Sequence, residues 1–91
     1  MEVIESGVCG TKDVRVVKRE MDMVGCGKNA EVKDISYSVQ IKILMCWHTI
    51  ATWDYEWTKD LAQADIDRSD LLCKMAARAL LTNMMQYGRL Q

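Results

Sequence analysis

Cys46 and His48 are the residues of this chain whose types and spacing come nearest to a reactive pair. A thiolate and an imidazole on one strand face could begin a zinc site or a nucleophile with its base. Zinc needs two further ligands, and Cys9 and Cys26 stand singly beside glycines, with no Cys-x-x-Cys or His-x-x-x-His spacing. A nucleophile also needs a group that orients its base. We therefore expect no catalytic residue, no metal site and no cofactor.

Acidic residues are concentrated between residues 54 and 70, where six acidic and two basic side chains give a local net charge of −4. Residues 65–70 resemble the start of a calcium loop, but position six is Asp70 instead of Gly and position twelve is Ala76 instead of Glu. An acidic surface of this kind can attract a basic one. The predicted partner-binding acids are Asp54, Glu56, Asp60, Asp65, Asp67 and Asp70.

The candidate residues named above must be positioned by secondary structure, and one segment has a sustained two-residue period of apolar and polar side chains. From residue 35 to residue 57, odd positions are mostly apolar and even positions mostly polar, which is typical of strands with one buried face. This parity predicts that Trp47, Trp53, Tyr55 and Trp57 point into the core. A single strand of that length would span roughly 75 Å at about 3.3 Å per residue. We expect the chain to reverse or bend near residues 48–52, through an odd-length loop, a bulge or a bent continuous strand that keeps the parity.

The flanking segments complete the predicted sheet. Residues 1–12 are expected to form an N-terminal arm or short strand, and residues 13–24 the first main strand, with a parity slip near Val16 and Val17. The glycines of residues 25–29 predict a hairpin turn, so that the next strand pairs antiparallel to the first.

After residue 57 the pattern becomes helical. Thr58 is expected to cap a short helix, and Asp67 or Ser69 a second one that runs to about Tyr87 and ends at Gly88. The predicted inward stripe of the second helix is Leu72, Met75, Ala76, Ala79, Leu80, Asn83, Met84 and Tyr87.

Three further apolar residues, Leu71, Leu81 and Met85, lie off that stripe. Either the short helix covers them, or another chain does so through homodimerisation or partner docking. We therefore add Leu71, Leu81 and Met85 to the predicted partner-binding residues.

The composition fits one compact domain over residues 1–91, since 49% of the residues are hydrophobic and 27% charged in a chain of this length. The expected fold class is α+β, a three- to four-stranded antiparallel sheet with one face packed by C-terminal helices in the order β-β-β-α-α. The sheet should occupy residues 13–57 and the helical part residues 58–91. Without a membrane span or the features of a signal peptide, we expect a cytoplasmic protein with reduced cysteines.

For function, we expect a non-enzymatic protein-binding module, of the kind that small phage or mobile-element proteins use to block a host nuclease or defence complex. The expected partner is a protein with a basic surface, and a homodimer fits the helix equally well. One alternative is a small-ligand or nucleotide-binding protein that uses the sheet aromatics. A weak nucleic-acid-binding domain is another, disfavoured by the net charge of −1.

Overall fold

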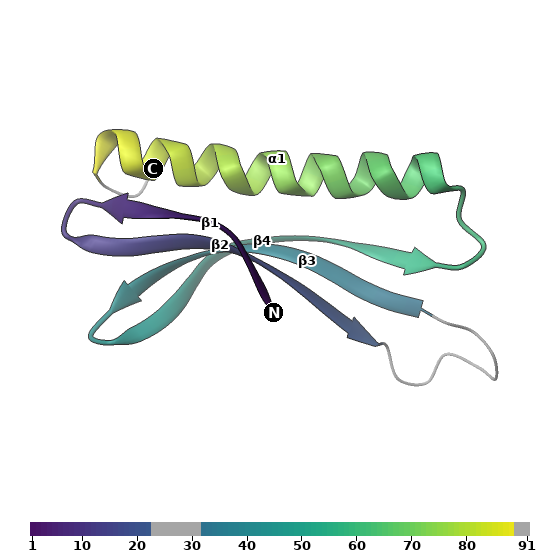
Figure 1. Cartoon of the computed structure of the whole chain (residues 1–91), viewed down its shortest axis with the longest axis horizontal. Coiled ribbons are helices and arrows are strands. Elements are labelled where there is room, and N and C mark those ends of the chain that lie inside the picture. The colour runs from purple at the N-terminus through teal and green to yellow at the C-terminus, as the bar shows by residue number, and fades with distance from the viewer. Residues whose placement is uncertain (23–31, 89–91) are drawn as a thin grey trace.

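The structure is a computed structural model that describes residues 1–22 and 32–88. Its elements are β1 (Glu2–Cys9), β2 (Lys12–Asp22), β3 (Val32–Ile43), β4 (Cys46–Thr58) and α1 (Gln63–Tyr87). The four strands form one antiparallel sheet in the order β1-β2-β3-β4. Figure 1 shows α1 lying along one face of the twisted sheet, while the β3–β4 hairpin diverges from it at the lower left. The α+β class with a four-stranded antiparallel sheet is confirmed.

The first element is a complete strand of eight residues, β1, which pairs with β2 across a turn at Gly10 and Thr11. Gly10 has a φ of 66°, a conformation that glycine adopts without steric cost. The predicted hairpin turn at residues 25–29 lies outside the described residues, but β2 and β3 are antiparallel as expected.

The chain reverses between β3 and β4 at Leu44 and Met45, before the predicted residues 48–52, whereas the bulge that was one of the predicted alternatives is present within that range, at Ile50. Both turn residues have positive φ, 51° and 68°, as a two-residue hairpin that follows the twist of the sheet requires. This turn pairs Ile43 with Cys46 and so moves the inward face from odd to even positions. Neither residue is glycine or asparagine, which is why the turn is hard to recognise in the sequence.

A bulge in β4 restores the odd parity. Val39 pairs with Ala51 but Gln40 pairs with Thr49, so Ile50 is an extra residue in β4. Because the turn and the bulge each shift the parity by one, the two shifts cancel and the alternation continues in register after Ile50. Between the two shifts the predicted faces are inverted: Trp47 lies on the face away from α1, and Cys46 and His48 lie on the helix side.

The parity slip expected in the first main strand is instead found in β1. Val3 pairs with Val17 and Glu5 with Val16, which leaves Ile4 as an extra residue. β2 is regular against β3, so Val16 faces α1 and Val17 faces the opposite side. Val17 is nevertheless only 2% exposed.

One helix, α1, is present in the described part of the chain, where the sequence predicted two. β4 continues to Thr58, and after a short turn α1 begins at Gln63, with the extended Ala62 as its first flanking residue. The predicted caps Asp67 and Ser69 therefore lie inside the helix, and Thr58 ends a strand. Gly88 ends α1 as predicted, in a left-handed conformation with its N–H donating to the Met84 carbonyl.

The rotation of α1 about its axis differs from the predicted one. Its buried residues are Ala77, Leu81 and Met84, whereas Leu72 and Met75, predicted to face inward, are exposed. Leu81 and Met85 were expected to lie off the inward stripe, and both pack on the sheet instead. The core is formed by this helix face and by residues of β2 and β3, among them Val14, Val16, Tyr37, Val39 and Ile41.

Two contacts determine this rotation, one at each end of α1. Near the start, Asp70 accepts hydrogen bonds from two tyrosines of the sheet. Near the end, Met85 lies directly over Gly7 of β1, where a Cβ atom would overlap its sulfur. The close approach requires a residue without a side chain, so Gly7 brings the helix onto the sheet at this point.

Candidate functional site

The six predicted partner-binding acids occupy three different places in the structure. Asp54 and Glu56 point from β4 to the face of the sheet away from α1, because their neighbours Trp53 and Tyr55 pack on the helix side. Asp60 lies in the turn before α1 and is exposed, as are the helical residues Asp65 and Asp67. Asp70 is half-buried between helix and sheet. The predicted single acidic surface is therefore divided.

Asp70 is engaged inside the molecule. Its Oδ1 accepts hydrogen bonds from the hydroxyls of Tyr37 at 2.7 Å and Tyr55 at 2.8 Å. The ammonium group of Lys18 lies 3.7 Å from the same oxygen. Together these residues form a lock between helix and sheet, which we call the tyrosine–aspartate lock. A carboxylate with these partners holds the helix in place and contributes little to an outer docking surface.

The ionisation of the lock follows from its environment. Burial raises the pKa of both Tyr37 and Tyr55, and their hydrogen bonds to Asp70 raise it further. Burial alone would raise the pKa of Asp70, but the two tyrosine hydrogen bonds and the charges of Lys18 and Lys74 outweigh it and hold that pKa below its usual range. Neither tyrosine is therefore suited to proton transfer near neutral pH.

Asp34, which the sequence did not single out, joins Asp54 and Glu56 on the face away from α1. It pairs with Glu56 and lies beside the Ser36–Asp54 pair. Burial first, and then the charge of Asp54 and a hydrogen bond with it, raise the pKa of Asp34. The pairing register of β3 with β4 brings these three acids together. Because the register cannot be read from the sequence, the sequence did not reveal this cluster.

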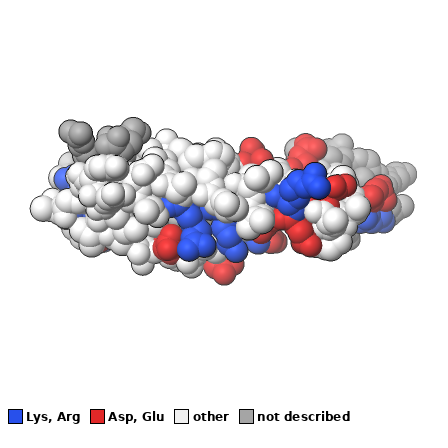
Figure 2. Space-filling model, turned by 90° about the horizontal axis from the view of Figure 1, so that it is seen from above, with Lys and Arg blue, Asp and Glu red and all other residues white. Residues whose placement is uncertain are grey.

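The exposed apolar residues of α1 lie next to the acids at its start. Leu71, Leu72 and Met75 are 54%, 61% and 57% exposed, and we call them the outer apolar stripe. Positions three and four apart on a helix are neighbours, so the stripe is continuous, and Asp67 is adjacent to Leu71. Figure 2 looks down on α1 and shows white, uncharged surface over much of the molecule, with red acidic side chains interspersed with blue ones toward the right-hand end.

Of the three apolar residues predicted to bind a partner, only Leu71 belongs to this stripe. Leu81 is fully buried, and Met85 is half-buried over Gly7. Leu72 and Met75, which the sequence assigned to the core, take their place on the outside. The apolar residues of α1 occur on both sides of the helix, so the periodicity alone did not determine which side faces the sheet.

Cys46 and His48 share one strand face as expected and are both exposed. Within residues 1–22 and 32–88, no group of three or more His, Cys, Asp or Glu side chains is arranged to hold a metal ion. The aromatic residues are divided between the two faces. Trp53 and Tyr55 pack against the core, and Trp47 lies on the opposite face.

The described part of the chain contains no helix that is long and apolar enough to cross a membrane. No protein-family model, curated protein or solved structure matches the chain.

Proposed function

We propose that this chain is a non-enzymatic protein-binding module that docks through the outer apolar stripe of α1 and the acids at the start of that helix. The observation that carries the proposal is the exposure of Leu71, Leu72 and Met75, each more than half accessible on a helix whose other side already packs on the sheet. Large adjoining apolar side chains on a surface mark protein interaction sites.

The surrounding charges favour a partner with a basic surface. Asp60, in the turn before α1, and Asp65 and Asp67, in the first turns of α1, are exposed near the stripe. With the exposed Lys59 and Arg68 they leave a net charge of −1 at the start of the helix. Complementary charges around an apolar contact accelerate association and select the partner. The proposed partner therefore presents an apolar contact beside Lys and Arg residues, as nucleic-acid-binding channels do, and a module that occupies such a channel acts as an inhibitor. This is the mode in which small phage or mobile-element proteins would block a host nuclease.

A fixed helix supports this mode of binding. The tyrosine–aspartate lock holds the first half of α1, and the contact of Met85 with Gly7 holds the second half. The stripe between them is presented on a rigid element, so little conformational entropy is lost when a partner binds.

The test compares two surface variants of the full chain in the capture of partners from a bacterial lysate. The stripe variant replaces Leu71, Leu72 and Met75 with Ser. Burial of a whole Leu or Met side chain is worth about 1.5–3 kcal/mol, so three half-exposed ones contribute roughly 3 kcal/mol and their loss weakens binding about 100-fold. The control variant replaces Asp54 and Glu56 with Lys on the opposite face, and it should retain the captured protein.

A second variant tests the charge. Replacing Asp65 and Asp67 with Lys should slow association with the same captured protein and reduce the salt dependence of binding. Light scattering on the wild-type chain separates this from self-association. A dimer that the stripe variant converts to a monomer would contradict the proposal in favour of a homodimer. Equal capture by the stripe variant and the wild type would contradict it altogether.

A further inference from the structure

A row of polar side chains crosses the face of the sheet away from α1. Ser6, Arg15, Gln40 and Thr49 are register partners on the four adjacent strands. Gln40 is only 7% exposed. Its Oε1 accepts a hydrogen bond from Arg15 Nε at 2.9 Å, and its Nε2 donates to Thr49 Oγ1 at 3.2 Å. Both ends of this buried amide are therefore used, and one result is a fixed position for Arg15 Nε.

Trp47 fixes the plane of the same guanidinium group. The central carbon of the Arg15 guanidinium lies 3.9 Å from the centroid of the Trp47 ring, in stacking contact. The side-chain hydrogen bonds and ion pairs of residues 1–22 and 32–88 use Nε of Arg15 and neither of its Nη nitrogens. An arginine held at Nε and over an aromatic ring presents its Nη pair in a preorganised orientation.

This arginine borders a shallow cavity of about 460 Å³. Its lining includes the side chains of Val3 and Val8, which are 50% and 53% exposed, and the hydroxyl-bearing Ser6. Volumes of this size are typical of sites for small ligands, with mostly apolar walls and a few polar groups that orient the ligand. The walls offer apolar contact, and Arg15 offers charge.

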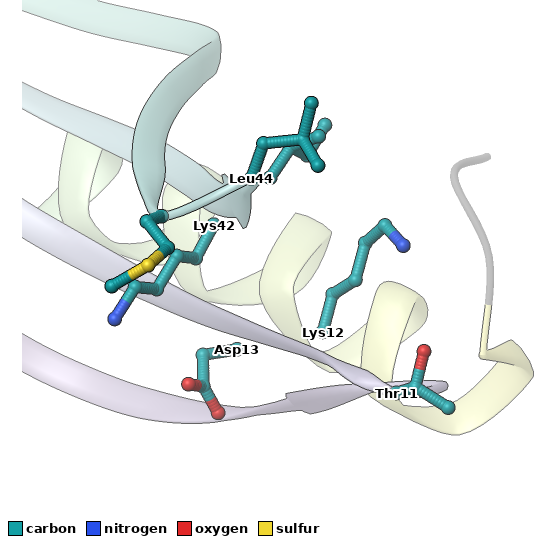
Figure 3. A pocket seen from close by; sticks show the side chains of 7 residues that line it. Thr11, Lys12, Asp13, Lys42 and Leu44 are labelled. Carbon is teal, nitrogen blue, oxygen red and sulfur yellow. The ribbon is translucent and has the colours of Figure 1, made fainter.

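The charges around the cavity leave a net positive site. Asp13 lines this cavity and also the adjoining pocket of about 310 Å³ between the two hairpin turns, where Lys42 is a neighbour. In Figure 3 the side chains of Lys42 and Asp13 extend toward the same side of that pocket. Lys42 Nζ also lies 6.0 Å from the centroid of the Trp47 ring that lines the cavity. Arg15 and Lys42 together with Asp13 therefore give the cavity and its edge a net charge of +1.

We propose that this cavity binds a small organic oxyanion, a carboxylate or phosphate monoester carried on an apolar body. The two oxygens of the ligand accept hydrogen bonds from the Arg15 Nη pair, the bidentate geometry for which guanidinium groups are suited. The apolar body covers Val3 and Val8. This site is on the opposite face of the sheet from the proposed protein-binding stripe and does not depend on it.

The test uses the fluorescence of Trp47 in a full chain in which the other two tryptophans, Trp53 and Trp57, are replaced by Phe. The probes are phenylacetate and phenyl phosphate, with benzyl alcohol as the uncharged counterpart. We expect saturable changes with one or both anions, at least tenfold weaker binding of benzyl alcohol, and at least tenfold weaker anion binding in an Arg15→Lys variant. The tighter anion identifies the oxyanion that the site prefers.

Arg19→Lys is the matched control, because Arg19 belongs to the same strand and the same face and should bind the anions as the parent does. Chemical-shift changes of the Arg15 Nε–H group in the unsubstituted chain give a second readout that needs no tryptophan replacement. Equal binding of benzyl alcohol, or equal losses in the Arg15→Lys and Arg19→Lys variants, would overturn the proposal. So would the absence of saturation in both readouts.

Discussion

Removing the carboxylate of Asp70 should destabilise the fold because two tyrosine hydroxyls share it. In an Asp70→Ala variant, Tyr37 and Tyr55 lose acceptors that lie 2.7 and 2.8 Å away. A hydrogen bond to a charged group contributes about 1.5–3 kcal/mol, and partial solvation reduces this, since the Asp70 side chain is 27% exposed. We expect a loss of about 2–3 kcal/mol in the free energy of unfolding. That is a large fraction of the roughly 5–14 kcal/mol expected for a chain of this length.

The contribution of the Asp70 carboxylate to stability also depends on pH, with a defined sign. The pKa of Asp70 is lowered in the folded state, so its contribution is complete above the unfolded pKa of about 3.9 and is lost as the pH falls through the lower, folded value. The stability difference between the wild type and Asp70→Asn should therefore shrink on acidification below about pH 4. The tyrosine pKa values are raised, so above about pH 10 the unfolded state ionises first and stability falls as the pH rises.

Urea unfolding followed by circular dichroism measures these differences, and a double-mutant cycle isolates the lock. Tyr37→Phe should cost about 1 kcal/mol in the wild type and almost nothing in the Asp70→Ala background. Asp67→Ala is the matched control, because Asp67 is exposed on α1 and, among the residues that the structure describes, its side chain hydrogen-bonds only to that of Gln63. If the free energies of unfolding of Asp70→Ala and the wild type differ by less than about 0.5 kcal/mol, or if the losses in the cycle add, the shared hydrogen bonds do not stabilise the fold.

Three further predictions concern a close contact, a turn and two cysteines. Gly7→Ala should cost about 1–3 kcal/mol in urea unfolding, because the new methyl group overlaps Met85, and Met85→Ala should recover part of that loss; an unchanged midpoint would contradict the close approach. Met45→Gly should raise the free energy of unfolding by about 0.5–1 kcal/mol, since Met45 is 86% exposed at a φ of 68°; a decrease would show that the methionine packs in the folded state. Burial, followed by the charges of two nearby aspartates, raises the pKa of Cys73. In single-cysteine variants, Cys46 should therefore react faster than Cys73 with a disulfide reagent at about pH 8. The reverse order would count against the placement of Cys73 on the packed side of α1.

The alternation of residues 35–57 was enough to predict a sheet with one buried face, and it assigned Ile35, Tyr37, Val39 and Ile41 correctly. It failed for Trp47 because two shifts of parity, the turn at residues 44–45 and the bulge at Ile50, cancel in the sequence. Neither has a glycine to mark it. A periodicity gives the face of a strand only between such shifts, and the pairing of the strands is needed to locate them.

The helix was predictable in extent at its C-terminal end but not in rotation. Gly88 marked that end, whereas Ala62 gave no signal for the start. The two apolar sides of α1 were indistinguishable by composition. Tertiary contacts far apart in the sequence, Asp70 with Tyr37 and Met85 with Gly7, selected the inner one. For the same reason Asp70 was expected on a docking surface, since an acid with a buried partner looks like any other acid in a sequence.

The order of the strands in the sheet has a consequence for how the chain folds. Because β1, β2, β3 and β4 each pair with their neighbour in the sequence, the sheet can assemble from pairs of strands that are consecutive in the chain, which favours rapid folding. The contact at the end of α1 is not local in the sequence. The helix follows β4 at one edge of the sheet, and its last turns must reach β1 at the other edge, where Met85 contacts Gly7. That closure is the long-range step, and until it occurs the apolar side of the first hairpin remains open to water. We therefore expect docking of the last turns of α1 to complete folding after the strands have paired.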